Sequence, residues 1–200
     1  VLSQKDETND FDVNEIVKDY LKEKYQKPGN VYLGLVHRLD RRVGGVLVLA
    51  KTSKAASRLS DDIRNNKFNK FYIAKTTGKL LENDSINVNI LKDEKTKKAI
   101  IDKKGKPSSL DYEIINYDES NTYVYVNLHT GRYNQIRVSF SYINHPLVND
   151  YKYSDCKVNN LELGLWCYKI IINHPVTKEK MEFISYPNGS IWSNLKLNNK

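Results

Sequence analysis

The stretch HRLDRRVGGVLVLAK, residues 37–51, joins a charged loop to an apolar run. Its loop part sets Asp40 between arginines, and its second part, residues 45–51, predicts a buried strand because apolar residues follow a glycine pair without interruption. A carboxylate on such a loop would stay ionised beside its cationic neighbours and would be available for attack or proton transfer. The alternative is a turn aspartate that caps its own backbone, and this stretch alone favours that alternative.

The residues on either side of this stretch alternate between helical and β-rich patterns. Apolar positions at three- and four-residue steps predict a helix over residues 10–27, and Ser53 is placed to cap a second helix that runs to Ile63. We expect one domain over residues 1–200, of the α+β class, with a mostly antiparallel mixed sheet and helices packed against it. The remaining predicted elements are strands at 70–77, 86–91, 98–102, 109–117, 122–129, 165–173 and 181–186, and a helix at 134–143.

The strand KFYIA, residues 70–74, could expose an aromatic side chain to a cleft. Tyr72 and Ala74 share one face of such a strand, while Phe71 and Ile73 share the other and would pack the core. An ordinary half-buried strand explains the same pattern.

A third stretch, LHTGRYNQIR at residues 128–137, predicts a glycine turn that enters a helix. Arg132 would lie near the helix N-terminus, which is a natural phosphate site. Arg137, one turn later, would point inward and would need an anion, for which Asp40 is a candidate. Alternatively, Arg137 reaches solvent.

Composition restricts the function classes further. The net charge of +8 and the 14 tyrosines favour a nucleic-acid partner, although charge alone leaves a plain soluble protein equally open. Cys156 and Cys167 lack the spacing of a zinc site and are too few for a disulfide framework, so we expect no metal and a reducing compartment. The apolar runs are too short to span a bilayer, so we expect a cytoplasmic protein that does not bind membranes.

Three motifs in order carry a family resemblance. HRLDRRVGGVLVLAK, NKFYIAKTTGK and HTGRYNQIRVSFSYINHPLVND resemble the motifs of RluA-type pseudouridine synthases, and LWCYKIIINHPVTKEKMEF is similar to that family's terminal strand pair. Together they cover residues 37–183, and their ordered agreement outweighs the alternatives given for each motif alone. The resemblance implies the pseudouridine synthase catalytic-domain fold. It also implies an isomerase that flips and converts a uridine of ribosomal or transfer RNA without a metal or an organic cofactor.

The resemblance also implies roles for individual residues. Asp40 would be the catalytic aspartate, Arg137 its partner, and Tyr72 would lie against the target base and assist proton removal from C5. Whether the aspartate attacks the sugar or the ring stays open. We further expect RNA contacts from Arg38, which would enter the RNA as the uridine leaves its stack, from Ile136 near the base, and from His37, Lys70, Arg132 and Gln135.

Some positions depart from the family pattern. Asn134 stands at a usual histidine, Asn149 at a common glycine, and Val43-Gly44 at a common Thr-Ser pair. The family's opening strand, with its Lys-Pro motif, is expected before residue 1.

Two other function classes fit the sequence less well. A non-catalytic RNA-binding protein of the same fold is disfavoured because Asp40, Tyr72 and Arg137 are all present. A hydrolase of phosphate or sugar esters would need a second catalytic carboxylate or a metal cluster, and the sequence offers no convincing one. We therefore expect a monomeric RNA-modifying enzyme.

Overall fold

The computed structural model describes residues 12–157 and 161–197. Its largest element is an eight-stranded sheet, beside which lie a two-stranded ribbon and three α-helices of the described residues. In chain order the elements are α1 (Val13–Lys24), β1 (Gly34–Leu35), β2 (Gly44–Gly45), β3 (Leu49–Ala50), α2 (Ser53–Arg64), β4 (Asn69–Thr77), β5 (Asp84–Asp93), β6 (Lys98–Ile101), β7 (Lys106–Tyr117), β8 (Asn121–Leu128), α3 (Gln135–Tyr142), β9 (Leu165–Asn173), β10 (Lys180–Ile184) and the 3₁₀ helix η1 (Ser190–Trp192).

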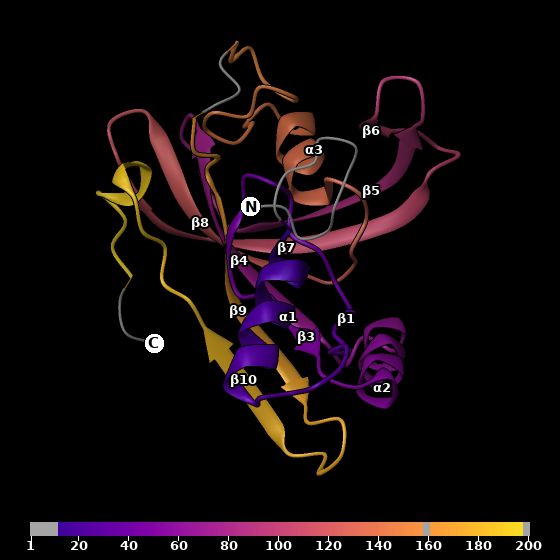
Figure 1. Cartoon of the computed structure of the whole chain (residues 1–200). Coiled ribbons are helices and arrows are strands. Elements are labelled where there is room, and N and C mark those ends of the chain that lie inside the picture. Colours follow the sequence, from indigo (N-terminus) through magenta and orange to yellow (C-terminus); the bar gives the residue numbers. More distant parts are fainter. Residues whose placement is uncertain (1–11, 158–160, 198–200) are drawn as a thin grey trace.

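The sheet is mixed and mostly antiparallel, as predicted. Its strand order is β10-β9-β4-β8-β7-β5-β6, and every neighbouring pair on this path is antiparallel. The exception is β2, which pairs with β9 in parallel. Figure 1 shows this sheet crossing the molecule, with α3 above it, its β9–β10 edge at the bottom and α1 in front of that edge.

Successive residues of β4 enter two different apolar clusters. Tyr72 and Ala74 belong to the larger cluster, which we call the main core, whereas Ile73 packs in a second cluster with Tyr123 and Trp192. Because neighbouring side chains of a strand point to opposite faces, the two clusters lie on opposite faces of the sheet. The main core also contains Leu59 of α2 and Ile136 and Phe140 of α3. These two helices therefore cover the face of the sheet that carries Tyr72.

Side chains cap the first two helices. Asp12 accepts a hydrogen bond from the Glu15 N–H (2.7 Å) at the start of α1; the first two residues of the predicted range 10–27 lie outside the described residues. At α2 the cap is Thr52, whose Oγ1 accepts from the Ala55 N–H (3.1 Å), so the prediction of Ser53 was wrong by one position.

The strand predicted over residues 45–51 is interrupted. Gly44 and Gly45 pair with Trp166 and Cys167 of β9, while Leu49 and Ala50 pair with β1 instead. Between the two, the Val48 N–H donates to Nε2 of His37 (2.9 Å) rather than to a neighbouring strand. The prediction of one continuous strand was wrong, since of its residues only Gly45, Leu49 and Ala50 lie in strands. The change of partner depends on contacts distant in sequence.

Gly45 lies where the chain leaves its pairing with β9, before it pairs with β1. Its φ is +115°, and a Cβ there would lie 2.1 Å from the Cys167 carbonyl oxygen. We expect Gly45→Ala to lower the free energy of unfolding by at least about 2 kcal/mol, because both the backbone and the neighbouring strand would have to shift. Urea denaturation measures this. Gly29→Ala is the control, since no atom lies within 4 Å of a Cβ built there; equal stability of the two variants would contradict the assignment.

Candidate active site

The guanidinium of Arg137 binds two carboxylates. Nη1 donates to Oδ2 of Asp40 (2.5 Å), and Nε and Nη2 donate to the two oxygens of Asp150 (2.8 and 2.6 Å). Arg137 is 3% exposed and Asp150 0%. The pairing of Arg137 with Asp40 that the sequence suggested is therefore present, and Asp150 is a second partner that the sequence did not single out.

Burial of α3 forces Arg137 to find its partners inside. Its residues 135–140 are all buried, so the side chain has no path to solvent. Burial alone would lower the pKa of Arg137, but the hydrogen bonds and charges of Asp150 and Asp40 outweigh it and raise that pKa above its usual range. The Tyr153 ring, 5.2 Å from the guanidinium carbon, adds a cation–π contact. The guanidinium therefore stays charged and fixed in place.

Asp40 has a second hydrogen-bond donor. Nδ2 of Asn134 lies 2.8 Å from Oδ2, the oxygen that Arg137 also binds. Within the described residues, Oδ1 of Asp40 accepts no hydrogen bond, and the side chain keeps 24% of its surface exposed. One oxygen is thus held by two donors while the other is left for a substrate atom.

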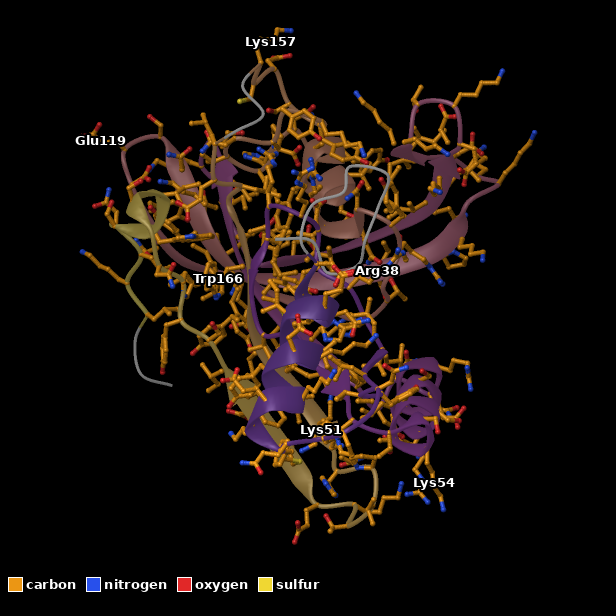
Figure 2. The ribbon with its side chains drawn as sticks, in the orientation of Figure 1. Arg38, Lys51, Lys54, Glu119, Lys157 and Trp166 are labelled. Carbon is orange, nitrogen blue, oxygen red and sulfur yellow. The ribbon has the colours of Figure 1, made fainter. Side chains whose placement is uncertain are left out.

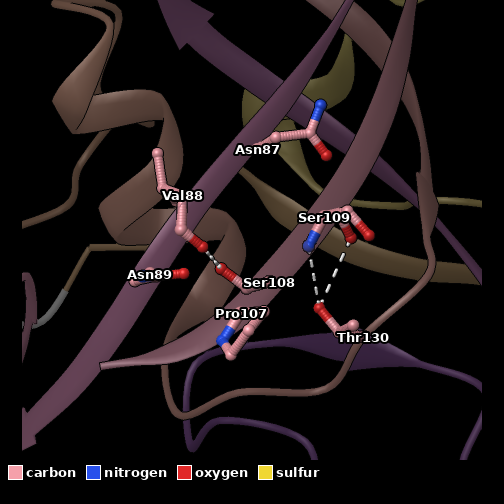
Figure 3. Close-up of a pocket in the computed structure, with 7 residues that line it drawn as sticks. All are labelled: Asn87, Val88, Asn89, Pro107, Ser108, Ser109 and Thr130. Atoms are coloured by element: carbon pink, nitrogen blue, oxygen red, sulfur yellow. Dashed lines mark hydrogen bonds between the residues drawn. The ribbon is translucent and has the colours of Figure 1, made fainter. Parts of the chain in front are cut away.

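The loop before α3 is held by Gln135, for which we predicted an RNA contact. Its Oε1 accepts from the Thr130 hydroxyl (2.8 Å) and the Arg132 N–H (3.0 Å), and its Nε2 donates to the Ser109 carbonyl (3.1 Å). Figure 3 shows Thr130 bonded to Ser109 in a pocket lined by residues of β5 and β7. Gln135 is 3% exposed, and these three hydrogen bonds hold the turn before α3. Its RNA contact stays a prediction.

Ile136 is buried as well, in the main core. Its side chain packs among other apolar side chains of that core, and its contact with the base stays a prediction.

Tyr72 lies beside the strand that holds the Asp40 loop. It pairs with Cys167 of β9, and Cys167 in turn pairs with Gly45. Tyr72 is 7% exposed, so it lies within the main core and not in an open cleft. Burial, followed by the neighbouring Cys167, raises the pKa of Tyr72 well above its usual value. Its phenol is therefore protonated at neutral pH and cannot accept a proton from C5 in this state.

Cys167 is not a nucleophile here. Burial raises the pKa of its thiol to about 12, against the lowering effects of Tyr72, Lys70 and Val46. The site therefore has no reactive thiolate at neutral pH.

Each of the three motifs contributes a basic side chain: Arg38, Lys70 and Arg132. Nζ of Lys70 would lie 3.0 Å from a Cβ built on Gly131, so Lys70 of the second motif reaches the turn of the third. Burial lowers the pKa of Lys70. Arg132 donates its Nε–H to the Pro107 carbonyl (3.0 Å), and Arg38 is exposed on the loop of Asp40. Figure 2 shows Arg38 near the middle of the view, above Lys51 and Lys54.

His37, another predicted RNA contact, turns inward instead. Its Nε2 accepts the Val48 N–H, and its ring packs edge-on against Phe68, with 5.2 Å between centroids. Burial, with a smaller contribution from Lys70, lowers the pKa of His37 to about 4. The imidazole is therefore neutral at pH 7 and holds the loop that carries Arg38 and Asp40.

The sequence pattern of a family described as RNA pseudouridylate synthase matches residues 1–142. This chain belongs to that family. The match covers the Asp40 loop, β4 and all of α3, so it contains the three predicted catalytic residues and Asn134. The family predicted from the three motifs is confirmed.

Curated relatives of this pseudouridylate synthase family member include two bacterial proteins. "Ribosomal large subunit pseudouridine synthase C" of Vibrio vulnificus (strain CMCP6) is 32% identical over 171 residues, which are 82% of this chain and 54% of that protein. The protein of the same name from Buchnera aphidicola subsp. Schizaphis graminum (strain Sg) is 34% identical over 171 residues, 80% of this chain and 54% of its own. This chain spans about half the length of the curated relatives it matches.

A solved structure shares the fold. The structure titled "Human RNA Pseudouridylate Synthase Domain Containing 4" superimposes with a TM-score of 0.77 at 18% identity, covering 93% of this chain and 81% of that one. The predicted catalytic-domain fold is thereby confirmed.

Two structural features are absent from residues 12–157 and 161–197. No cluster of three or more His, Cys, Asp and Glu side chains there could hold a metal ion. No helix of the same residues is long and apolar enough to cross a membrane.

The lowered pKa of His37 predicts a pH-dependent stability. Between pH 6.5 and about 4 the unfolded chain binds a proton at this residue that the folded chain does not, so stability is lost as the pH falls through this window. We expect the loss from this residue to reach about 3 kcal/mol. Urea denaturation at pH 7, 5.5 and 4.5 measures it. His37→Gln, which keeps an acceptor but does not titrate, should show a shallower decline; parallel curves would refute the assignment.

Proposed function

We propose that this chain is the catalytic domain of a pseudouridine synthase that acts on large ribosomal subunit RNA. The observation that carries the proposal is the hydrogen-bonded salt bridge between Asp40 and Arg137, placed within the ordered motifs of the family. The choice of ribosomal RNA is supported by the names of the curated relatives. A single catalytic domain over residues 1–200, a cytoplasmic location and a monomeric state are parts of the same proposal.

The reaction moves one bond of a uridine within the RNA. The bond from N1 of uracil to C1′ of ribose breaks, a bond from C5 to C1′ forms, the proton on C5 leaves and N1 gains a proton. Atoms and electrons balance without a redox change or hydrolysis, so the proposal includes neither a metal nor an organic cofactor.

Asp40 supplies the negative charge that this exchange needs. Acting as a nucleophile on the sugar or the ring, or stabilising positive charge at C1′, it requires a deprotonated oxygen that faces the nucleotide. Arg137 and Asn134 both bind Oδ2, which leaves Oδ1 to meet the nucleotide. Since Arg137 is itself fixed by Asp150, the position of the carboxylate does not depend on bound RNA.

The target uridine must leave its stack before it can reach Asp40. Flipping a nucleotide costs a few kcal/mol, which contacts to phosphates and filling of the gap offset. Arg38 is exposed two residues before Asp40 and is the side chain proposed to enter the gap. Lys70 and Arg132 are proposed to bind phosphates near the third-motif turn, and the net charge of +8 would draw RNA to the protein.

Tyr72 and Ile136 would form the apolar support beneath the flipped base. Both side chains are buried in the main core on the face covered by α3. With its phenol protonated, Tyr72 would act by stacking and by excluding water, and a different group would receive the C5 proton.

Replacing the carboxylate tests the proposal. We expect Asp40→Asn to reduce pseudouridine formation below about 1% of wild type, since the amide carries no negative charge, while leaving RNA binding within a few fold. The assay is tritium release from a large-subunit RNA transcript made with 5-³H-uridine.

Asp19→Asn on the exposed surface of α1 is the matched control and should behave as wild type. Normal RNA binding by a wild-type chain that releases no tritium would instead support a non-catalytic RNA-binding protein.

A further inference from the structure

We infer that Asn134 is a positioning residue whose side-chain amide holds Oδ2 of Asp40 together with Arg137, so that Oδ1 is presented to the substrate. The inference rests on the proposed function and assigns a role to a residue for which the sequence predicted none.

The hydrogen-bond partners of Asn134 fix which way its amide points. The Tyr153 hydroxyl accepts the Ala99 N–H (2.7 Å), so its own proton is directed to Oδ1 of Asn134 (3.2 Å). Burial raises the pKa of Tyr153 to about 12, so this proton is present at neutral pH. Nζ of Lys152, which can only donate, lies 3.4 Å from the same oxygen. With its oxygen so occupied, the amide must turn its NH₂ group to Asp40.

This chain of contacts links the Asp40 loop to the edge of the sheet. Ala99 lies on β6, and Tyr153 also stacks on the guanidinium of Arg137. The segment around Tyr153 therefore supports both donors of Asp40, one by a hydrogen bond and one by a cation–π contact.

The backbone of Asn134 supports a specialised role. An asparagine at a helix N-cap usually has an extended backbone and uses its side chain to accept a hydrogen bond from the first turn. Asn134, at the N-cap of α3, instead has φ +48° and ψ +28° and makes no capping hydrogen bond. Its side chain is directed to Asp40 instead. Asparagine, aspartate and histidine are the side chains that best tolerate this left-handed conformation.

The chemical consequence is a donor that does not titrate. A hydrogen bond to the charged form of a carboxylate favours that form, and an amide supplies it at every pH. Loss of the donor should therefore affect the chemical step, and affect it most at low pH. Six other charged or titratable groups lie around Asp40 and Asn134: Arg42, Arg137, Asp150, Tyr151, Lys152 and Tyr153. Of these, Lys152 and Tyr153 bind the Asn134 side chain and lose that contact on substitution to glycine.

The test compares two asparagines that flank the same helix, α3. Asn134→Gly removes the donor while tolerating the left-handed backbone. Asn144→Gly makes the same change at the other end of α3, where φ is +63° and the side chain is exposed. Single-turnover tritium release and RNA affinity are measured for both with the large-subunit RNA transcript, from pH 5 to 9.

We expect Asn134→Gly to slow the chemical step by about ten- to a hundred-fold, the effect of losing a hydrogen bond to a charged group. RNA affinity should stay within about three-fold, and the acid half-point of the rate profile should move to higher pH. Asn144→Gly should match wild type in all three measurements.

Two variants at position 134 sharpen the result. Asn134→Asp, which keeps the shape but adds a like charge, should move the acid half-point further than glycine does. Asn134→His, which restores an N–H donor, should recover part of the lost rate.

The measurements distinguish failure of the proposed function from failure of the positioning role of Asn134. A wild-type chain that releases no tritium overturns the proposed function and this inference with it. An active wild type whose rate and pH profile are unchanged by Asn134→Gly overturns the positioning role alone, as does an equal loss in Asn144→Gly.

Discussion

One buried guanidinium joins the parts of this site. Arg137 lies in a helix whose residues 135–140 are all buried, and it is compensated by Asp150 on one side and Asp40 on the other. A buried charge without partners would cost several kcal/mol, so the helix, the Asp40 loop and the segment that carries Asp150 must come together for the native state to form. The same requirement positions the catalytic group, because the Asp40 carboxylate that pairs with Arg137 is also the one proposed to face the substrate.

The neighbouring strands hold this arrangement in place. The Asp40 loop continues into Gly44 and Gly45, which pair with β9, and β9 pairs with β4. His37 accepts the Val48 N–H and so closes the same loop from its other side. The position of the Asp40 carboxylate is therefore fixed by the pairing of β2 with β9, by the His37 imidazole and by Arg137 of α3. None of these contacts requires RNA. Such preorganisation is what electrostatic stabilisation of a transition state needs.

Much of this could be predicted from local patterns. Alternation and turn residues located β4 to β10 to within a few residues, and the glycine turn before α3 placed Arg137 on an inner face. What local patterns could not supply were partners distant in sequence. Asp150 follows an ordinary Val-Asn pair, which gives no sign of a buried partner. His37 lies in a basic loop, where a histidine is expected to contact RNA. Nothing in the sequence near Asn134 indicates that its amide reaches residue 40. One signal was available: asparagine at positions 134 and 149 suits the left-handed backbone found at both.

The most direct test of the central claim is to replace Arg137 with lysine and measure single-turnover pseudouridine formation beside RNA affinity and unfolding. An ammonium can pair with one carboxylate but cannot reproduce three hydrogen bonds in a fixed plane. The account predicts a folded, RNA-binding chain whose chemical step is slower by about a hundred-fold or more. A lysine variant that forms pseudouridine at close to the wild-type rate would contradict it.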